Sequence, residues 1–293
     1  MAEMAPSETP GDFRLGFAGD TFNTAWYLAR LNSDVDVAYF TAVGDDAISQ
    51  QMRAAFVAAR IDDSHVQVVK ISTVGLYMIS LSDGERSFSY WRGQSAARQM
   101  MQDASALERA IADADLVYFS GITLAILDEP SRARLFAALG AARVAGKTIA
   151  FDPNLRPRLW SDTPVMTDAI MQGAAVSDIA LPSFEDEATW FNDCDPEATA
   201  DRYVAAGTTT VVVKNGPNPV FYHQDKRRGS VLVPPLNTVV DTTAAGDSFN
   251  AAILAGFMAK TDFTDSIRVA CRVAGAVVQG KGALVPIELS LRA

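Results

Sequence analysis

Short apolar runs alternate with helix-like segments along most of this chain, and the alternation predicts its fold class. Continuous apolar runs lie at residues 116–120, 148–151, 179–182 and 210–214. Strands covered on both faces read as unbroken runs, because neither side of the strand meets water. Helical patterns lie between them, for example at 131–145 and 197–206. Strand, helix and strand in repeated order predict an α/β fold with a parallel sheet and right-handed crossovers.

Residues 35–42 predict an earlier strand of the same type, between helical patterns at 21–31 and 47–59. A chain of 293 residues is long enough for one large α/β domain. We therefore expect a single Rossmann-like domain over residues 1–293, with three layers in the order α/β/α.

Residues 66–95 break this pattern. Two strand-like runs, 74–81 and 86–91, flank the tetrapeptide Ser-Asp-Gly-Glu, and Asp-Gly between such runs is a hairpin signal. Apolar and polar residues partly alternate there, which predicts a small antiparallel sheet with one exposed face. Together with residues of about 11–18, this segment is expected to form a β lid over a binding site. Its exposed face is a candidate surface for a homodimer.

Composition narrows the function classes. Hydrophobic residues make up 49% of the chain, so a large core can form and disorder is not expected. The net charge of −10 and the absence of a dense basic stretch argue against nucleic acid as a partner. Cys194 and Cys271 do not have a metal-like spacing, and no apolar leader or membrane-length run is present. We expect a soluble cytoplasmic protein without a membrane partner.

The stretch 241–249 reads Asp-Thr-Thr-Ala-Ala-Gly-Asp-Ser-Phe and carries the clearest chemistry. It follows a β-like run at 237–240 and opens a helix of small residues at 245–258. Small residues at a helix start let backbone N–H groups approach an anion, and the helix dipole favours negative charge there. Asp247, in the first turn, is well placed to accept a proton from an attacking hydroxyl. The alternative is a structural helix cap with a tight turn.

A second informative stretch, 17–25, reads Phe-Ala-Gly-Asp-Thr-Phe-Asn-Thr-Ala. Gly19 can bring the backbone close to a ligand, and Asn23 follows one helical turn later. The alternative is an ordinary helix N-terminus with Asp20 as its cap.

Both stretches resemble signatures of the ribokinase-like (PfkB-type) carbohydrate kinases. The usual C-terminal form is Asp-Thr-x-Gly-Ala-Gly-Asp, so Ala244 stands where glycine is common. The N-terminal form is Gly-Gly-x-x-x-Asn-x-Ala, with Ala18 in place of one glycine. The resemblance implies a ribokinase-like fold and transfer of the γ-phosphate of ATP to a sugar hydroxyl. It also implies that Asp247 is the general base and that backbone amides of Ala244, Ala245 and Gly246 form the anion hole.

Two tyrosines and two arginines are expected to converge on the substrate. Tyr77, Tyr90 and Arg92 lie on the proposed lid strands, and Arg156 follows a core strand, where ligands bind in open α/β sheets. Arginine binds a carboxylate bidentately and tyrosine can hydrogen-bond it, which favours an acidic sugar. The alternatives are a cross-strand aromatic pair and solvated arginines.

Three short motifs look most like the 2-keto-3-deoxygluconate kinases within that family: Gly-Leu-Tyr at 75–77, Tyr-x-Arg at 90–92 followed by Ser95-Ala96, and Asp-x-Asn-x-Arg-x-x-Leu-Trp at 152–160. The resemblance implies phosphorylation of 2-keto-3-deoxygluconate to its 6-phosphate. It implies substrate contacts from Gly19, Asp20, Asn23, Tyr77, Tyr90, Arg92, Arg156 and Asp247. Fructose, ribose, 2-keto-3-deoxygalactonate or a nucleoside remain alternative substrates, and a non-catalytic sugar-binding protein remains an alternative class.

The nucleotide side has no Walker A sequence. By resemblance, ATP contacts are implied for Ser183, Lys214, Gly216, Thr243, Ala245 and Gly246. Residues 273–282 either flank the adenine or form a packed helix.

The family often has Asn-x-x-Glu where this chain reads Ser-Phe-Glu-Asp at 183–186. Asp186 is expected to hold Mg²⁺ through water, and the family implies a monovalent cation such as K⁺ near Asp241 and Thr243. Family members usually begin with a core strand, and residues 2–5 are expected to be the end of that strand.

Overall fold

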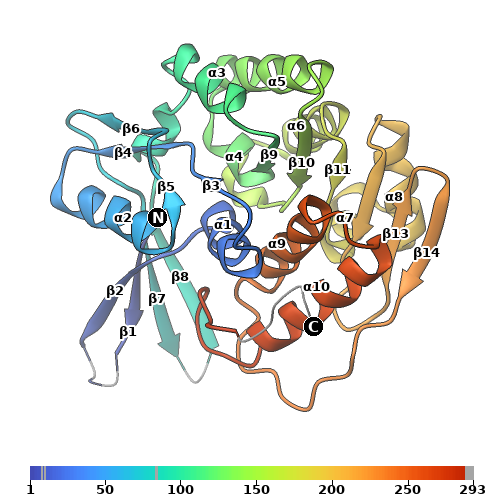
Figure 1. Ribbon diagram of the computed structural model, residues 1–293. Coiled ribbons are helices and arrows are strands. Elements are labelled where there is room, and N and C mark those ends of the chain that lie inside the picture. Colours follow the sequence, from blue (N-terminus) through green and yellow to red (C-terminus); the bar gives the residue numbers. More distant parts are fainter. Residues whose placement is uncertain (8, 10, 83–84, 288–293) are drawn as a thin grey trace.

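The computed structural model has a main sheet with helices packed around it (Figure 1). The structure describes residues 1–7, 9, 11–82 and 85–287. The sheet has six strands in the order β14-β13-β12-β11-β10-β9, of which β9 to β12 are parallel and β13 and β14 antiparallel. Their bounds are β9 Leu116–Ser120, β10 Thr148–Asp152, β11 Ile179–Ala180, β12 Thr210–Val213, β13 Val220–Gln224 and β14 Arg227–Val231.

Helices cover both faces of this sheet, and alternating strand residues face two separate cores. Ala150 and Val212 belong to one core, and Ile149 and Val211 to the other. The first core is covered by α1 Asp20–Leu31, α9 Ala245–Met258 and α10 Phe263–Val277. The second is covered by α4 Gly121–Ile126, α5 Glu129–Val144, α6 Thr163–Ala175 and α8 Pro196–Ala205. The predicted three-layer α/β/α architecture is therefore confirmed.

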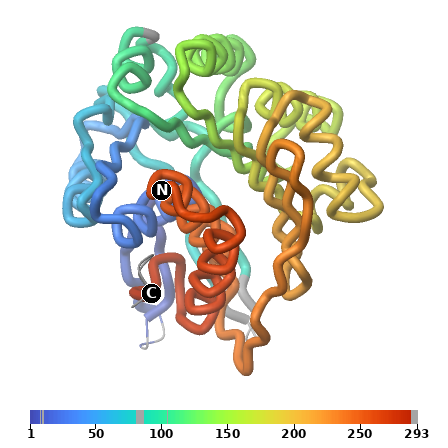
Figure 2. The backbone as a smooth tube through the Cα atoms, turned by 45° about the vertical axis from the view of Figure 1, so that its right-hand side comes forward, coloured from blue at the N-terminus to red at the C-terminus, as the bar shows by residue number. Residues whose placement is uncertain are grey.

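The first and last thirds of the chain meet in space. Figure 2 shows the red helices α9 and α10 beside the blue N-terminal part of the chain, and α1 packs directly against α9. This contact joins the two stretches that the sequence singled out. None of the helices in the described ranges is long and apolar enough to cross a membrane.

The region of residues 35–42 differs from its prediction as one strand of the main sheet. It forms β3 Val37–Ala38, which pairs with β5 Ile61–Asp62, and β4 Thr41–Gly44, which pairs with β6 Val66–Val69. The chain changes partner at Tyr39, whose N–H donates to the carbonyl of Asp62 at 2.9 Å. The Tyr39 ring packs 4.9 Å from that of Phe56, between the two short strands and α2 Ala47–Ala58.

A separate sheet of four strands, which we call the small sheet, projects from the main body (Figure 1). Its order is β2-β1-β7-β8, with bounds β1 Ala2–Pro6, β2 Phe13–Phe17, β7 Leu76–Ser82 and β8 Glu85–Trp91. Strands β7 and β8 form the expected antiparallel pair, with Ser82 opposite Glu85. The predicted Asp-Gly turn at 83–84 lies outside the described residues.

Two sequence expectations about strands are wrong. Residues 2–5 are not part of a core strand, because β1 pairs antiparallel with β2 and parallel with β7 in the small sheet. Residues 237–240 form no strand; the N–H of Val240 instead donates to the carbonyl of Val278, just beyond α10, at 2.8 Å. The side chains of Val239 and Val240 are 58% and 47% exposed, so the apolar run does not mark a buried strand.

Candidate active site

One cavity of about 1730 Å³ lies where α1, α9, the small sheet and the carboxyl ends of β10 and β12 meet, and it continues between β9 and β3. Every site residue that the sequence predicted lines this cavity. These residues are Gly19, Asp20, Asn23, Tyr77, Tyr90, Arg92, Arg156, Ser183, Asp186, Lys214, Gly216, Thr243, Ala244, Ala245, Gly246 and Asp247. The fold thus brings together residues from across the whole chain.

The start of α9 forms an anion-binding corner. Ala244 precedes the helix with φ 60° and ψ 15°, in the left-handed region, which glycine adopts more easily than alanine. This explains why related sequences place glycine there. The N–H groups of the first helical turn have no intrahelical partner and carry partial positive charge. A Cβ built on Gly246 would lie only 3.8 Å from Nζ of Lys214, so an ammonium group stands beside this corner.

Asp247 is the carboxylate of this corner. Its Oδ2 accepts a hydrogen bond from Nδ2 of Asn23 at 2.7 Å. Burial, together with the nearby charge of Asp20, raises the pKa of Asp247 to about 7, although the Asn23 hydrogen bond opposes the shift. A carboxyl group that changes protonation near neutral pH can both take up and release a proton, which suits a general base.

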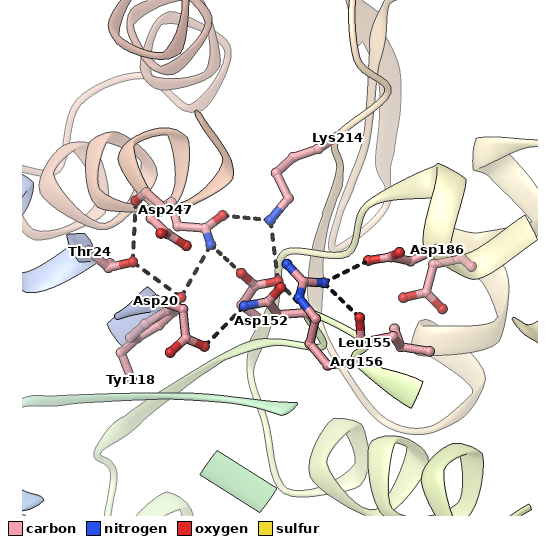
Figure 3. A network of polar contacts seen from close by, with 12 residues as sticks. Asp20, Thr24, Tyr118, Asp152, Leu155, Arg156, Asp186, Lys214 and Asp247 are labelled. Atoms are coloured by element: carbon pink, nitrogen blue, oxygen red, sulfur yellow. Dashed lines mark hydrogen bonds and ion pairs between the residues drawn. The ribbon is translucent and has the colours of Figure 1, made fainter. Parts of the chain in front are cut away.

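A network of hydrogen-bonded polar side chains lies beside the start of α9 (Figure 3). Nζ of Lys214 lies 3.3 Å from Oδ1 of Asp152 and 3.0 Å from Oδ1 of Asn250. Nδ2 of Asn250 donates to Oδ2 of Asp152 at 2.7 Å and to the Tyr118 hydroxyl at 3.2 Å. Asp152 and Asn250 are only 3% and 0% exposed. Lys214 is therefore held between a buried carboxylate and the helix start.

The sequence analysis assigned no role to Asp152, Asn250 or Tyr118. Asn250 lies three residues after Asp247 on α9, a spacing that places both on one side of the helix. From that spacing Asn250 could have been predicted as a site residue. For Tyr118 the sequence offers no such signal, because this residue lies within an apolar strand pattern.

The loop after β10 is hydrogen-bonded to the start of α1. Nδ2 of Asn154 donates to Oδ2 of Asp20 at 3.0 Å, and the N–H of Asn154 donates to Oδ1 of Asp152 at 3.3 Å. Asn154 has a positive φ of 34°. These contacts fix the loop that carries Arg156, and the sequence analysis gave Asn154 no role of its own.

Two arginines reach the cavity from opposite sides. Nη1 of Arg156 lies 3.8 Å from Oδ2 of Asp186, at the start of α7 Phe184–Phe191. The guanidinium of Arg92, from the end of β8, lies 4.4 Å from the ring centre of Tyr90. Burial lowers the pKa of Arg92, and guanidinium groups remain charged at neutral pH nonetheless. Arg92 and Arg156 therefore bring positive charge to the cavity that Asp247 also lines.

Comparison with known proteins identifies the family. The pfkB family carbohydrate kinase profile matches residues 3–289. The chain belongs to the PfkB family of carbohydrate kinases. Among its relatives, a 2-dehydro-3-deoxygluconokinase from Haemophilus influenzae is 37% identical over 276 residues, which cover 92% of this chain and 88% of that protein.

Solved structures support the same fold for this PfkB kinase. The PfkB protein from Polaromonas sp. JS666 has a TM-score of 0.85 and 27% identity, covering 96% of this chain and 93% of that one. A putative ribokinase II from E. coli, in complex with ATP and Mg²⁺, has a TM-score of 0.82 and covers 97% of this chain and 91% of that one. At 22% identity this second likeness concerns the fold alone. The predicted ribokinase-like fold is confirmed.

Kinases of the PfkB family use ATP with Mg²⁺, and the cavity offers few protein ligands for the metal. Within the described residues, no group of three or more His, Cys, Asp or Glu side chains is placed to hold a metal ion. Burial raises the pKa of Asp186, and the positive charge of Arg156 opposes this. Mg²⁺ usually keeps several waters and binds one or two carboxylates plus substrate phosphates. Asp186, which lines the cavity beside Glu185, fits that manner of binding.

The other end of the PfkB kinase cavity is apolar. Val233, Leu236 and Val239 line it from the segment after β14, and Ala274 and Gly275 line it from α10. Residues 273–277 are helical, as one of the two predicted alternatives has it, and two of them line the cavity. Contact of this segment with adenine stays a prediction.

Proposed function

We propose that this protein is a kinase of 2-keto-3-deoxygluconate, which it converts to the 6-phosphate with ATP. The observation that carries the proposal is the presence of Arg92 and Arg156 in the same cavity as Asp247. An acidic sugar offers its carboxylate to both guanidinium groups, of which that of Arg156 already lies near Asp186, whereas a neutral sugar offers no such anion. The 37% identity to a 2-dehydro-3-deoxygluconokinase supports the same substrate.

The substrate binds with its carboxylate toward the arginines and its terminal hydroxyl toward Asp247. Gly19, Asp20 and Asn23 lie at the start of α1, between these two ends. We expect the small sheet to close over the sugar as a lid. Closure excludes water, which limits hydrolysis of ATP.

In the reaction, Asp247 accepts the proton of the substrate's terminal hydroxyl, and the hydroxyl oxygen attacks the γ-phosphorus in line. The bond from this phosphorus to the β,γ-bridging oxygen breaks, and ADP leaves with that oxygen. The backbone N–H groups at the start of α9, with that of Gly246 among them, and the ammonium of Lys214 stabilise the negative charge on the phosphoryl oxygens. Asp186 would hold Mg²⁺ through water, and the metal would supply further positive charge for the phosphates.

The nucleotide occupies the remaining end of the cavity. We expect adenine to lie against the apolar wall to which Leu236 and Gly275 both contribute. Ser183, Gly216 and Thr243 line the space between this wall and the helix start, where the ribose and phosphates lie.

A homodimer through the small sheet remains part of the proposal. Phe13, Leu15 and Trp91 are 40%, 42% and 56% exposed on its strands, and burying such side chains against a second copy is favourable. Sedimentation at micromolar protein should give a dimer, and Leu15→Glu should give a monomer. Detection of monomer alone in the parent protein would refute the proposed dimer.

We also propose that a K⁺ ion binds near Asp241 and Thr243. Oδ1 of Asp241 accepts from the N–H of Thr243 at 3.1 Å, and Oδ2 accepts from the N–H of Gly282 at 2.7 Å. Replacing K⁺ by a bulky organic cation should lower turnover if this carboxylate binds the ion. A cytoplasmic location also remains a prediction.

The proposal is tested by Mg²⁺- and ATP-dependent ADP release with 2-keto-3-deoxygluconate, 2-keto-3-deoxygalactonate, fructose, ribose and adenosine. Turnover with the first acid, well above that with the neutral compounds, is expected. Preference for a neutral sugar would keep the kinase and discard the carboxylate site. Folded protein without activity on any of them would favour the non-catalytic alternative.

A further inference from the structure

Glu3 and Tyr77 stand side by side on neighbouring strands of the small sheet. Strands β1 and β7 are parallel, and their register places Glu3 opposite Tyr77. The Tyr77 hydroxyl donates a hydrogen bond to Oε2 of Glu3. Tyr77 is among the residues that line the cavity and Glu3 is not. Glu3 therefore reaches the cavity only through the tyrosine.

This hydrogen bond fixes what the Tyr77 oxygen can do. A phenol has a single proton to donate, and an ionised carboxylate can only accept. Because the proton is directed at Glu3, the oxygen lone pairs remain for a ligand in the cavity. Burial and the negative charge of Glu3 raise the pKa of Tyr77 far above its usual value. Tyr77 is thus neutral at physiological pH and acts as an acceptor toward the cavity.

An acceptor at this position does not suit a carboxylate or keto oxygen, which are acceptors themselves. It suits a hydroxyl group, which has a proton to donate. Tyr77 and Asp247 line the same cavity, so the tyrosine oxygen is available to the substrate hydroxyls that bind there. The arginines are left as the groups that bind the carboxylate.

We propose that Glu3 is a specificity-determining residue, which acts by orienting the Tyr77 hydroxyl so that its oxygen accepts a hydrogen bond from a secondary hydroxyl of the sugar acid. The inference rests on the proposed function, because it assumes an acid with hydroxyls between its carboxylate and its reacting end. In 2-keto-3-deoxygluconate these are the hydroxyls on C4 and C5. Glu3 positions Tyr77 and does not touch the substrate.

The test compares kcat/KM for 2-keto-3-deoxygluconate with that for its 4-deoxy and 5-deoxy analogues. The parent protein should prefer the full substrate over one analogue by about tenfold, the typical effect of one hydrogen bond of this kind. Glu3→Met keeps the side-chain length but removes the acceptor, so the tyrosine proton can turn into the cavity. The preference should then fall to near one, as it should in Tyr77→Phe.

The double variant Glu3→Met/Tyr77→Phe should show no further loss of preference beyond either single variant, because both changes act on one hydrogen bond. Ser89→Ala, on β8 and outside the cavity lining, is the matched control and should keep the full preference. A purely structural role of Glu3 would lower kcat/KM for all three compounds equally and leave their ratio unchanged.

An unchanged ratio in Glu3→Met, or unequal and additive effects of the two changes, would overturn the inference. The same ratio can be read without turnover, from dissociation constants of the acids measured by calorimetry. Absence of turnover in the parent protein would therefore refute the proposed function while the binding ratio still decides the role of Glu3.

Discussion

Asn23 and Asp247, which are 224 positions apart in the chain, are joined by a hydrogen bond of 2.7 Å from Nδ2 to Oδ2. The bond connects the helices α1 and α9 and thereby the two stretches that the sequence singled out. It also acts against burial: burial raises the pKa of Asp247, whereas the amide donor lowers it. The position of Asn23 therefore controls both the orientation and the protonation of the proposed base.

Asp247→Asn should abolish most turnover and preserve sugar binding. Loss of a general base lowers kcat by roughly 10²- to 10⁴-fold. The dissociation constant of the sugar acid, measured by calorimetry, should change little, because the amide has nearly the same shape. Asp265→Asn, at the exposed start of α10, is the matched control and should keep full activity. Near-normal turnover of Asp247→Asn would remove this residue from the mechanism.

The pH dependence should report Asp247. The base must be unprotonated to accept a proton, so kcat/KM should rise with pH through about 7 and level off above it. Asn23→Ala removes the hydrogen bond that favours the carboxylate, so the same rise should move to higher pH. Profiles between about pH 5 and about pH 9 check this, since that range brackets the titration. A shift to lower pH in Asn23→Ala would contradict the assignment.

The folded stability should depend on the same carboxyl group. Its folded pKa lies above the ordinary value of 3.8 for this group, so the folded state binds the proton more tightly than the unfolded chain. Its favourable contribution is full below the unfolded pKa and is lost as pH rises through about 7. Urea unfolding should therefore show Asp247→Asn to be more stable than the parent at pH above the folded pKa. Equal stabilities there would speak against a buried, strained carboxylate.

Removal of either arginine should weaken binding of the acid. Arg92→Gln or Arg156→Gln should raise KM for 2-keto-3-deoxygluconate by roughly tenfold or more, because a hydrogen bond to a charged group contributes about 1.5–3 kcal/mol. The amide analogue of the substrate, which lacks the negative charge, should be affected much less. Arg158→Gln, exposed and outside the cavity lining, is the control. Equal effects on acid and amide would argue against a carboxylate site.

Lys214 and Asp152 should act as one unit on the nucleotide. Lys214→Met should lower kcat and weaken the binding of ATP more than the binding of ADP. The reason is that the ammonium lies beside the helix start where the γ-phosphate is transferred. Asp152→Asn should have a smaller effect of the same kind, and the double variant should lose less than the sum. Single-turnover rates and nucleotide dissociation constants check this coupling. Strict additivity would show that Asp152 does not position Lys214.

Ala244→Gly should stabilise the protein. The left-handed backbone at φ 60° costs an alanine about 1–2 kcal/mol, of which glycine's greater flexibility in the unfolded chain offsets about 0.5–1 kcal/mol. A net gain of roughly 0.5–1 kcal/mol is expected in urea unfolding. Ala252→Gly, buried in the middle of α9, is the counterpart and should destabilise by about 1 kcal/mol or more. A loss of stability in Ala244→Gly would contradict the assigned conformation.

The sequence predicted the parts of the fold that depend on local patterns. The buried parallel strands and the helices between them follow from unbroken apolar runs, and β7 with β8 follows from alternation around Asp-Gly. The motifs at 17–25 and 241–249 also predicted which helix starts meet in the cavity.

The failures arise where pairing over long distance decides the structure. Residues 35–42 have the composition of a core strand. The chain nevertheless divides at Tyr39 into β3, which pairs with β5, and β4, which pairs with β6. Val239 and Val240 are apolar but exposed. Asn250 and Tyr118 are ordinary residues of a helix and a strand until the fold places them against Asp152.

The most direct test of the central claim is ³¹P NMR of the product formed from ATP, Mg²⁺ and 2-keto-3-deoxygluconate. We expect a phosphomonoester on the terminal C6 oxygen, formed by the parent protein and not by Asp247→Asn. Release of inorganic phosphate alone, or a phosphoester formed with fructose but not with the keto-deoxy acid, would contradict the account.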